Sequence, residues 1–181
     1  MGSKSSAPID YPSVSIDHPF TETELHKLWR RFKKLDHSNT GFVDLDDILS
    51  IYELSLNPLV YRIFILFCGK SPFDDDDEFR ISFDNYVDVL SVFHPDTQLE
   101  KKKMFLFKVF DVDCDGQITA PDLFYLMKMM LGENISDPQL GELVGLLMRE
   151  AVGMDTTAIS YEQFSGLVND QELEDELKIA F

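Results

Sequence analysis

The sequence predicts an all-α protein of four helix–loop–helix units, arranged as two lobes with short strand pairing between paired loops. Three observations support this class. Apolar residues recur at helical spacing through most of the chain after residue 20. Acidic twelve-residue segments separate some of these stretches. A β-branched residue also recurs at Val43, Ile81, Ile118 and Ile159, at steps of 38, 37 and 41 residues, which indicates an internal repeat.

The first two helices are predicted from caps and apolar stripes. Thr21 and Glu24 form the capping-box pattern of a helix start. Apolar residues then recur on one face at Leu25, Leu28, Trp29, Phe32 and Leu35. A second stripe, within residues 59–67, predicts the helix that leads into the second loop, with Pro58 in its first turn.

The second half of the chain repeats this organisation. Residues 123–130 carry the stripe of the helix after the third loop, and Gly132 is its predicted end. Residues 140–147 carry the stripe of the helix that leads into the fourth loop. Because one unit leaves an apolar face that a second unit must cover, we expect a first lobe at residues 21–93 and a second at 98–170.

Three further segments connect or flank these lobes. His94–Gln98 is the expected joint, because Pro95 interrupts a helix. Residues 1–20 contain three prolines and several serines, and we expect a flexible arm there. Residues 171–181 are expected to form a C-terminal tail.

The third loop, Asp111–Asp122, reads DVDCDGQITAPD and matches the calcium-loop pattern D-x-[DN]-x-[DN]-G with a carboxylate at the twelfth position. The predicted ligands are Asp111, Asp113, Asp115, the backbone carbonyl of Gln117, and Asp122. Calcium takes six to eight such oxygens, and helical stripes on both sides make this an EF-hand unit. Aspartate reaches one methylene less far than the usual closing glutamate, so we expect weaker calcium binding and competition from Mg²⁺.

The first loop, Asp36–Asp47, is a second copy with the sequence DHSNTGFVDLDD. Its candidate ligands are Asp36, Ser38, Thr40, the backbone carbonyl of Phe42, and Asp47. Hydroxyls at the third and fifth positions are weaker ligands than carboxylates. Whether this loop binds a cation or serves as a structural partner therefore stays open from the sequence.

The second loop has lost the metal pattern. Arg80 stands at the seventh position, the glycine of the sixth is missing, and Asn85 replaces the closing acid. An insertion brings the acidic run Asp74–Asp77, which is typical of a solvated loop. Cys68 falls where the first ligand belongs, and we interpret it as a structural residue.

The fourth loop is also degenerate. Val152, Met154 and Gln163 occupy its first, third and twelfth positions, so the side chains that should bind a cation are missing. Ile159 can still pair with Ile118 of the third loop. We therefore expect one cation-binding loop and one bracing loop in the second lobe.

Composition excludes several classes of function. The formal net charge of −17 would repel a phosphate backbone, so nucleic acid is not an expected partner. Two cysteines are too few for a disulfide framework and suit a reduced, cytoplasmic setting. The residues show no nucleophile–base constellation, so an enzyme is not expected. The N-terminal MGSKSS predicts myristoylation of Gly2, which would give reversible association with a membrane.

Three longer stretches carry a family resemblance: RRFKKLD (30–36), LNPLVYRI (56–63) and LFYLMKMMLGENISDPQLGELV (123–144). With them the chain resembles the calcineurin B family, the regulatory subunits of the calcium-dependent serine/threonine protein phosphatase. The similarity covers nearly the whole chain after residue 20. It implies a non-catalytic subunit that clasps an amphipathic helix of the calcineurin catalytic subunit in an apolar groove.

The resemblance also implies which residues meet partners. Methionine suits an adaptable groove, so the LMKMML segment is the best local candidate for its wall. In the family, the segment that matches Met130, Leu131, Asn134 and Ile135 lies near the docking site for substrates and for immunophilin–drug complexes. The implied partner residues are Leu126, Met127, Met130, Leu131, Asn134 and Ile135.

Departures from the family leave alternatives open. The family normally has four calcium-competent loops, whereas this chain keeps at most two. A calcineurin B-homologous EF-hand protein that binds an ion exchanger shares the myristoylation signal and degenerate loops, although its later loops are usually the competent ones. A calcium buffer without a partner is a third reading, but buffers favour loops that close with glutamate.

Overall fold

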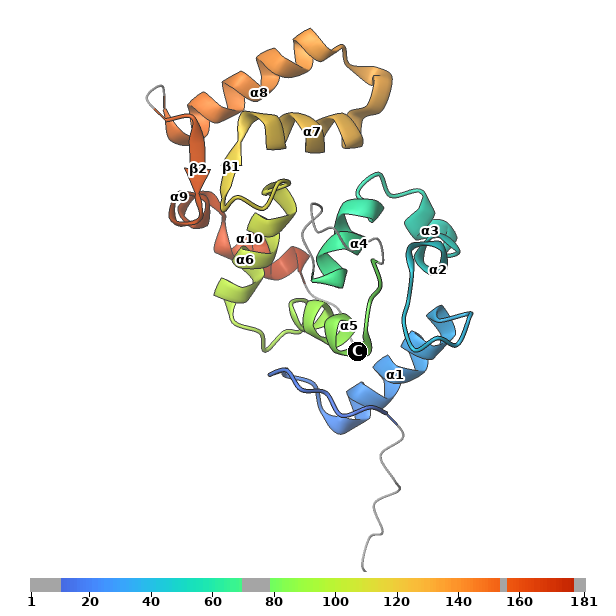
Figure 1. Cartoon of the computed structure of the whole chain (residues 1–181). Helices are drawn as coiled ribbons and strands as arrows, with labels where there is room; N and C mark the ends of the chain where they lie inside the picture. Colours follow the sequence, from blue (N-terminus) through green and yellow to red (C-terminus); the bar gives the residue numbers. More distant parts are fainter. Residues whose placement is uncertain (1–10, 70–78, 154–155, 178–181) are drawn as a thin grey trace, which may run out of the picture.

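The computed structural model of the chain describes residues 11–69, 79–153 and 156–177. It confirms the predicted all-α class, with helices connected by loops and one small antiparallel sheet (Figure 1). Gly2, the acidic run 74–77 and Met154 lie outside the described residues. The elements are, in chain order, α1 (Glu22–Leu35), α2 (Leu45–Leu49), α3 (Tyr52–Ser55), α4 (Val60–Cys68), α5 (Phe83–Ser91), α6 (Leu99–Phe110), β1 (Gln117–Thr119), α7 (Ala120–Leu131), the 3-10 turn η1 (Gly132–Asn134), α8 (Asp137–Val152), β2 (Ala158–Ser160), α9 (Tyr161–Leu167) and α10 (Asp170–Glu176).

The start of α1 confirms the predicted capping box. The Thr21 backbone N–H donates to the Glu24 carboxylate at 2.8 Å, and the Glu24 N–H donates to the Thr21 hydroxyl at 3.4 Å. These bonds satisfy amide groups that have no partner within the helix. The pKa of Glu24 is lowered, mainly because the Thr21 backbone and hydroxyl donate to its ionised form.

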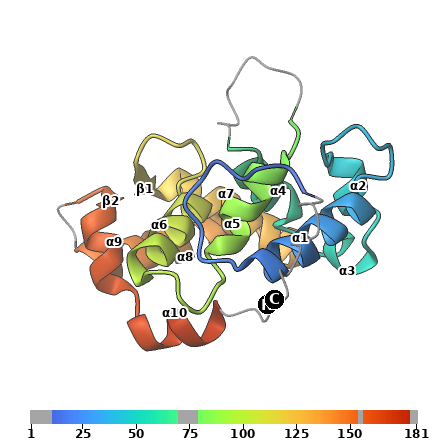
Figure 2. The ribbon, with the colours of Figure 1, turned by 90° about the horizontal axis from the view of Figure 1, so that it is seen from below.

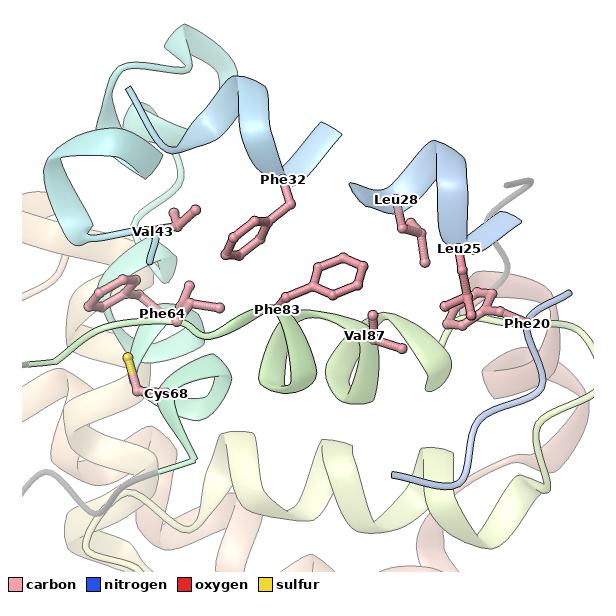
Figure 3. Packing of buried hydrophobic residues seen from close by; sticks show 10 residues of the cluster. Phe20, Leu25, Leu28, Phe32, Val43, Phe64, Cys68, Phe83 and Val87 are labelled. Carbon is pink, nitrogen blue, oxygen red and sulfur yellow. The ribbon is translucent and has the colours of Figure 1, made fainter. Parts of the chain in front are cut away.

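The first hydrophobic core joins α1, α4 and α5 (Figure 3). Phe32 of α1 points toward Phe83 of α5, and their ring centroids are 5.4 Å apart. The fully or nearly buried members are Phe20, Leu25, Leu28, Phe32, Val43, Phe64, Cys68, Ile81, Phe83 and Val87. The burial of Cys68 among them agrees with a structural role.

Residues 11–20 lie against this core, although the sequence suggests a flexible arm. Tyr11, Val14 and Ile16 are partly buried on it, and Phe20 is one of its buried members. The Ser15 hydroxyl also donates to the Asp84 carboxylate at 2.8 Å. Apolar side chains between the prolines and serines therefore hold this segment to the first hydrophobic core, because their burial removes apolar surface from water.

Paired loops meet through the predicted β-branched residues. In the second half, β1 and β2 pair antiparallel with Ile118 opposite Ile159. In the first half, Val43 and Ile81 form an isolated bridge, with N–H to O distances of 3.0 and 2.8 Å. This confirms the expected strand pairing, and it places the third loop beside the fourth and the first beside the second.

A separate hydrophobic core lies in the second half of the chain. Its buried members are Phe107, Ile118, Leu140, Val144, Met148, Ile159 and Phe164. α7 and α8 form a helical hairpin that extends away from α1 (Figure 1). Gly132 ends α7 as predicted, and its φ of +58° is a conformation that side chains rarely adopt.

The C-terminal segment forms a further helix, α10, which packs on α6 (Figure 2). Two buried lysines of α6 hold its ends. The Lys102 ammonium donates to the Leu177 carbonyl at 3.0 Å, and the Lys103 ammonium lies 2.6 Å from the Asp170 carboxylate. Among the described residues, the helices are too short or too polar to cross a lipid bilayer.

Candidate metal centre

The third loop is held at both ends by helices. Asp111 is the residue that ends α6, and Asp122 lies in the first turn of α7. Between them the backbone turns through two left-handed residues, Cys114 with φ +61° and Gly116 with φ +87°. Glycine adopts that conformation without steric strain, which explains its place at the sixth position of the loop.

The carboxylates of this loop accept hydrogen bonds from the loop backbone. Asp111 accepts from the Asp115 N–H at 3.1 Å and from the Gly116 N–H at 3.0 Å. Asp122 accepts from the Val112 N–H at 3.1 Å and from the Thr119 N–H at 2.8 Å. Asp111 and Asp122 are both at least nine-tenths buried. These bonds turn the carboxylates toward the centre of the loop.

The geometry of this loop fits calcium. One carboxylate oxygen from each of Asp111, Asp113 and Asp115 lies within 4.8 Å of the other two. Calcium binds oxygen at about 2.3–2.6 Å, so two oxygens on one ion are at most about 5 Å apart. The three carboxylates can therefore share one ion as they stand. Asp122 is not part of this group, and its carboxylate accepts hydrogen bonds from both ends of the loop, at Val112 and Thr119.

The charge of the loop favours a cation. The pKa of Asp111 is raised, chiefly because burial removes water from its carboxylate. The neighbouring carboxylates of Asp115 and Asp122 also raise it, while the N–H groups of Gly116 and Asp115 act in the opposite direction. A divalent cation would offset this crowding of negative charge.

The backbone of the first loop donates to its first aspartate as in the third loop, but the side chains at its third and fifth positions are weaker ligands for a cation. Asp36 is buried, and its carboxylate accepts from the Thr40 N–H at 2.9 Å and from the Gly41 N–H at 2.8 Å. The hydroxyl of Thr40 lies 3.4 Å from the Asp36 carboxylate and 3.2 Å from the Phe42 carbonyl. Ser38 likewise offers a hydroxyl to Asp36 at 3.5 Å.

The closing acid of the first loop also has a competing partner. Asp47 is buried, and the ring nitrogen Nδ1 of His37 lies 3.0 Å from its carboxylate. Among the described residues, the first loop does not bring three acidic ligands together, because positions three and five carry hydroxyls. The third loop is therefore the stronger candidate for a metal centre.

The second loop is closed by a direct hydrogen bond within the protein. The Asn85 side-chain amide, at the closing position, donates to the Cys68 carbonyl at 2.7 Å. Cys68 stands where the first ligand of a working loop would be. An amide and a carbonyl thus meet where a cation would otherwise join the two ends. In the fourth loop, Gln163 instead accepts from the Ser160 N–H at 2.9 Å and caps α9.

Each half of the molecule also has an apolar cavity; the resemblance implied an apolar groove, but sequence reasoning missed the residues that line these cavities. The first, about 350 Å³, is lined by Leu35, Ile48, Ile51, Leu54, Asn57, Val60, Ile63, Phe64, Phe67, Ile81, Tyr86, Leu90 and Phe93. The second, about 320 Å³, is lined by Leu106, Phe110, Ile118, Leu123, Ile159, Phe164, Leu167 and Val168. Periodicity marks these residues as apolar faces but does not tell a filled core from an open one.

The predicted partner residues of α7 and its turn are dispersed. Leu126 is buried, while Met127, Leu131 and Ile135 pack partly buried against the second core. Met130 is 55% exposed. Asn134 is exposed, and its amide donates to the Leu131 carbonyl at 2.8 Å. These six residues line neither of the two apolar cavities.

Comparison with known proteins gives one consistent result. The calcineurin B of Naegleria gruberi is 36% identical over 181 residues, covering 99% of each chain. The type 1 calcineurin B of Dictyostelium discoideum is 36% identical over 161 residues, covering 88% of this chain and 86% of the relative. The type 2 calcineurin B of Homo sapiens is 35% identical over 181 residues, covering 98% of both. No protein-family model matches the chain.

Proposed function

The chain belongs to the calcineurin B family, and from this premise we propose that it clasps an amphipathic helix of a phosphatase catalytic subunit under the control of calcium. Members of this family are calcium-binding regulatory subunits, so the chain is not itself the enzyme. The calcineurin catalytic subunit is accordingly its partner.

The third loop is the proposed principal calcium site. The observation that carries this proposal is the group formed by Asp111, Asp113 and Asp115, whose oxygens lie close enough to share one ion. The first loop is proposed as a second, weaker site, because Ser38 and Thr40 replace two of its carboxylates. Asp122 and Asp47 both close their loops with a short side chain, which supports competition by Mg²⁺.

The two apolar cavities are the proposed grip on the partner helix. An amphipathic helix presents apolar side chains three and four residues apart, and these need pockets from which water is excluded. The cavity of the first half is lined almost entirely by apolar side chains, with Asn57 as its exception. Exposed Met130 and Asn134 remain proposed contacts for a further protein that docks on the complex.

Calcium titration of the full chain by calorimetry tests the proposed sites. Asp122→Ala should remove the stronger binding event, and Asp36→Ala should remove the weaker one. Binding that survives unchanged in Asp122→Ala would reject the third loop as the principal site. The absence of calcium binding in the wild-type chain would reject calcium control altogether.

Co-purification tests the proposed partner. The wild-type chain is expected to retain a calcineurin catalytic subunit and not the cytoplasmic segment of an ion exchanger. The reverse result would favour the calcineurin B-homologous alternative. Mass spectrometry of the N-terminus of the chain from its own cells would test the predicted myristoylation of Gly2.

A further inference from the structure

Arg62 is a buried cation that reaches from the first half of the molecule into the third loop. It lies in α4, which is otherwise apolar, and is only 3% exposed. Its Nε donates to the Val109 carbonyl at 3.3 Å, and its Nη1 donates to the Val112 carbonyl at 3.3 Å. Its Nη2 donates to the carbonyls of Lys108 and Asp111.

These acceptors are the end of α6 and the start of the metal loop. The last carbonyls of a helix have no partner within the helix, and they carry the negative end of its dipole. A guanidinium stays charged and offers five donors in a rigid fork, so one side chain can satisfy several of these carbonyls. Arg62 therefore fixes the backbone of Asp111, whose carboxylate is the first proposed ligand.

The neighbouring face of α4 lines the apolar cavity of the first half. Val60, Ile63, Phe64 and Phe67 follow one another at helical spacing along that wall. Leu66, four residues after Arg62, instead lines a cavity together with residues of α6. α4 and α6 are in contact. One short helix thus carries both a wall of the cavity and the hydrogen bonds that hold the metal loop.

We propose that Arg62 is a positioning residue that couples cation binding in the third loop to the shape of the first apolar cavity. The inference rests on the proposed function, because it needs calcium to bind the third loop. Calcium would fix the backbone around Asp111, Arg62 would transmit this to α4, and the cavity wall would follow. By linkage, if calcium strengthens the binding of a helix in the cavity by a given factor, that helix strengthens calcium binding by the same factor.

The chain contains its own reporter for this coupling. Trp29 is the single tryptophan and lies in the first core. Its ring centroid is 5.7 Å from that of Phe32, which is 5.4 Å from that of Tyr86 on the cavity wall. A change in the cavity should therefore reach Trp29 through two ring contacts and alter its fluorescence.

The test uses the full chain with the first loop disabled by Asp36→Ala, so that calcium can act only through the other half of the molecule. In this background, Trp29 emission should change on addition of calcium, with the midpoint that calorimetry gives for binding. Adding Arg62→Met should abolish the fluorescence change and weaken calcium binding by about five- to twentyfold. Adding Asp122→Ala should abolish both signals.

A second variant separates loss of the Arg62 hydrogen bonds from loss of folding. Arg62→Lys keeps the charge but lacks the fork, so it should retain a reduced fluorescence change, with circular dichroism like that of the parent. Calcium binding without any Trp29 response in the Asp36→Ala chain would overturn the coupling while leaving the calcium site intact. An unaltered response in folded Arg62→Met or Arg62→Lys would overturn the role of Arg62. Absence of calcium binding in the wild-type chain would reject the proposed function as well.

Discussion

Asp122 has two tasks that compete for a short side chain. One carboxylate oxygen accepts from the N–H groups of Val112 and Asp113, and the other accepts from the Thr119 N–H and hydroxyl. Binding a cation with both oxygens would require Asp122 to move inward or the loop to contract. The length of this side chain therefore sets how well the loop encloses calcium.

We expect Asp122→Glu to strengthen calcium binding by about tenfold or more, because the longer side chain can reach the ion with both oxygens. The gain should be smaller for Mg²⁺, which prefers six-coordinate geometry with shorter bonds. Calorimetric titration with each cation measures both effects, and Asp47→Glu is the matched change in the first loop. An unchanged or lower calcium affinity would show that reach is not what limits this site.

As pH is lowered, calcium binding at the third loop should weaken at a higher pH than it would at a site of ordinary aspartates. Because the pKa of Asp111 is raised, its carboxyl takes up a proton at a higher pH than an ordinary aspartate does. Protons and calcium compete for the ionised form, so affinity should fall as pH is lowered from neutral to about 5. Calcium titrations at several pH values measure this. Affinity that is constant across this range would contradict the effect of burial on Asp111.

The pKa of Asp111 also has a consequence for the metal-free fold. The folded state holds this proton more tightly than the unfolded state does. The contribution of Asp111 to stability is therefore greatest below the ordinary aspartate pKa, and it is lost as pH rises through the raised value. Calcium should restore stability at neutral pH, since it binds the ionised carboxylate of the folded chain.

α4 and α5 are joined where the second loop has lost its ligands. The bond between Asn85 and Cys68 links the start of α5 to the end of α4. The bridge between Val43 and Ile81 then joins this second unit to the first. A loop without a cation thus keeps a structural role that its sequence does not reveal.

We expect Asn85→Ala to lower the free energy of unfolding by about 1–3 kcal/mol, because it leaves the Cys68 carbonyl without this donor. Calcium binding at the third loop should change little. Urea denaturation followed by Trp29 fluorescence measures the loss. Asn134→Ala is the matched control, since Asn134 makes a similar bond to the Leu131 carbonyl from an exposed position. Equal losses in the two variants would argue against a special role for the Asn85 bond.

α4 also shows what apolar periodicity in the sequence predicts and what it does not. The stripe within residues 59–67 predicts a helix there, and the structure places α4 at Val60–Cys68. Pro58 lies just before it rather than in its first turn. Arg62 interrupts this apolar run, and the sequence gives no sign that its partners are 46 to 50 residues away. Contacts at such separations depend on how the lobes meet, which local patterns do not encode.

Across the whole molecule, repeated features were predictable and single contacts were not. The β-branched eighth position recurs in every unit, so the pairing of Ile118 with Ile159 could be predicted from the period alone. The packing of residues 11–20 and the docking of α10 depend on surfaces that form only after folding. The open cavities arise in the same way, from the angles between helices.

We expect the cavity of the first half to dominate binding of the catalytic subunit. Ile63→Gln places a polar amide on its wall and should weaken this binding by about tenfold or more. Tyr52→Gln is the matched control, because Tyr52 is 71% exposed and lies outside the cavity lining. Surface plasmon resonance with the purified catalytic subunit measures both. Equal effects of the two variants on affinity would show that the catalytic subunit does not bind in this cavity.

The closure of the second loop by Asn85 and Cys68 bears on the timing of a calcium response. Because protein atoms make this closure, α4 and α5, the two helices of the second unit, stay joined at resting calcium. A unit that is already assembled can stay bound to its partner between signals, while the shape of the cavity still responds to calcium. The rate of the response would then depend on an ion entering an assembled complex. It would not depend on the diffusional encounter of two proteins.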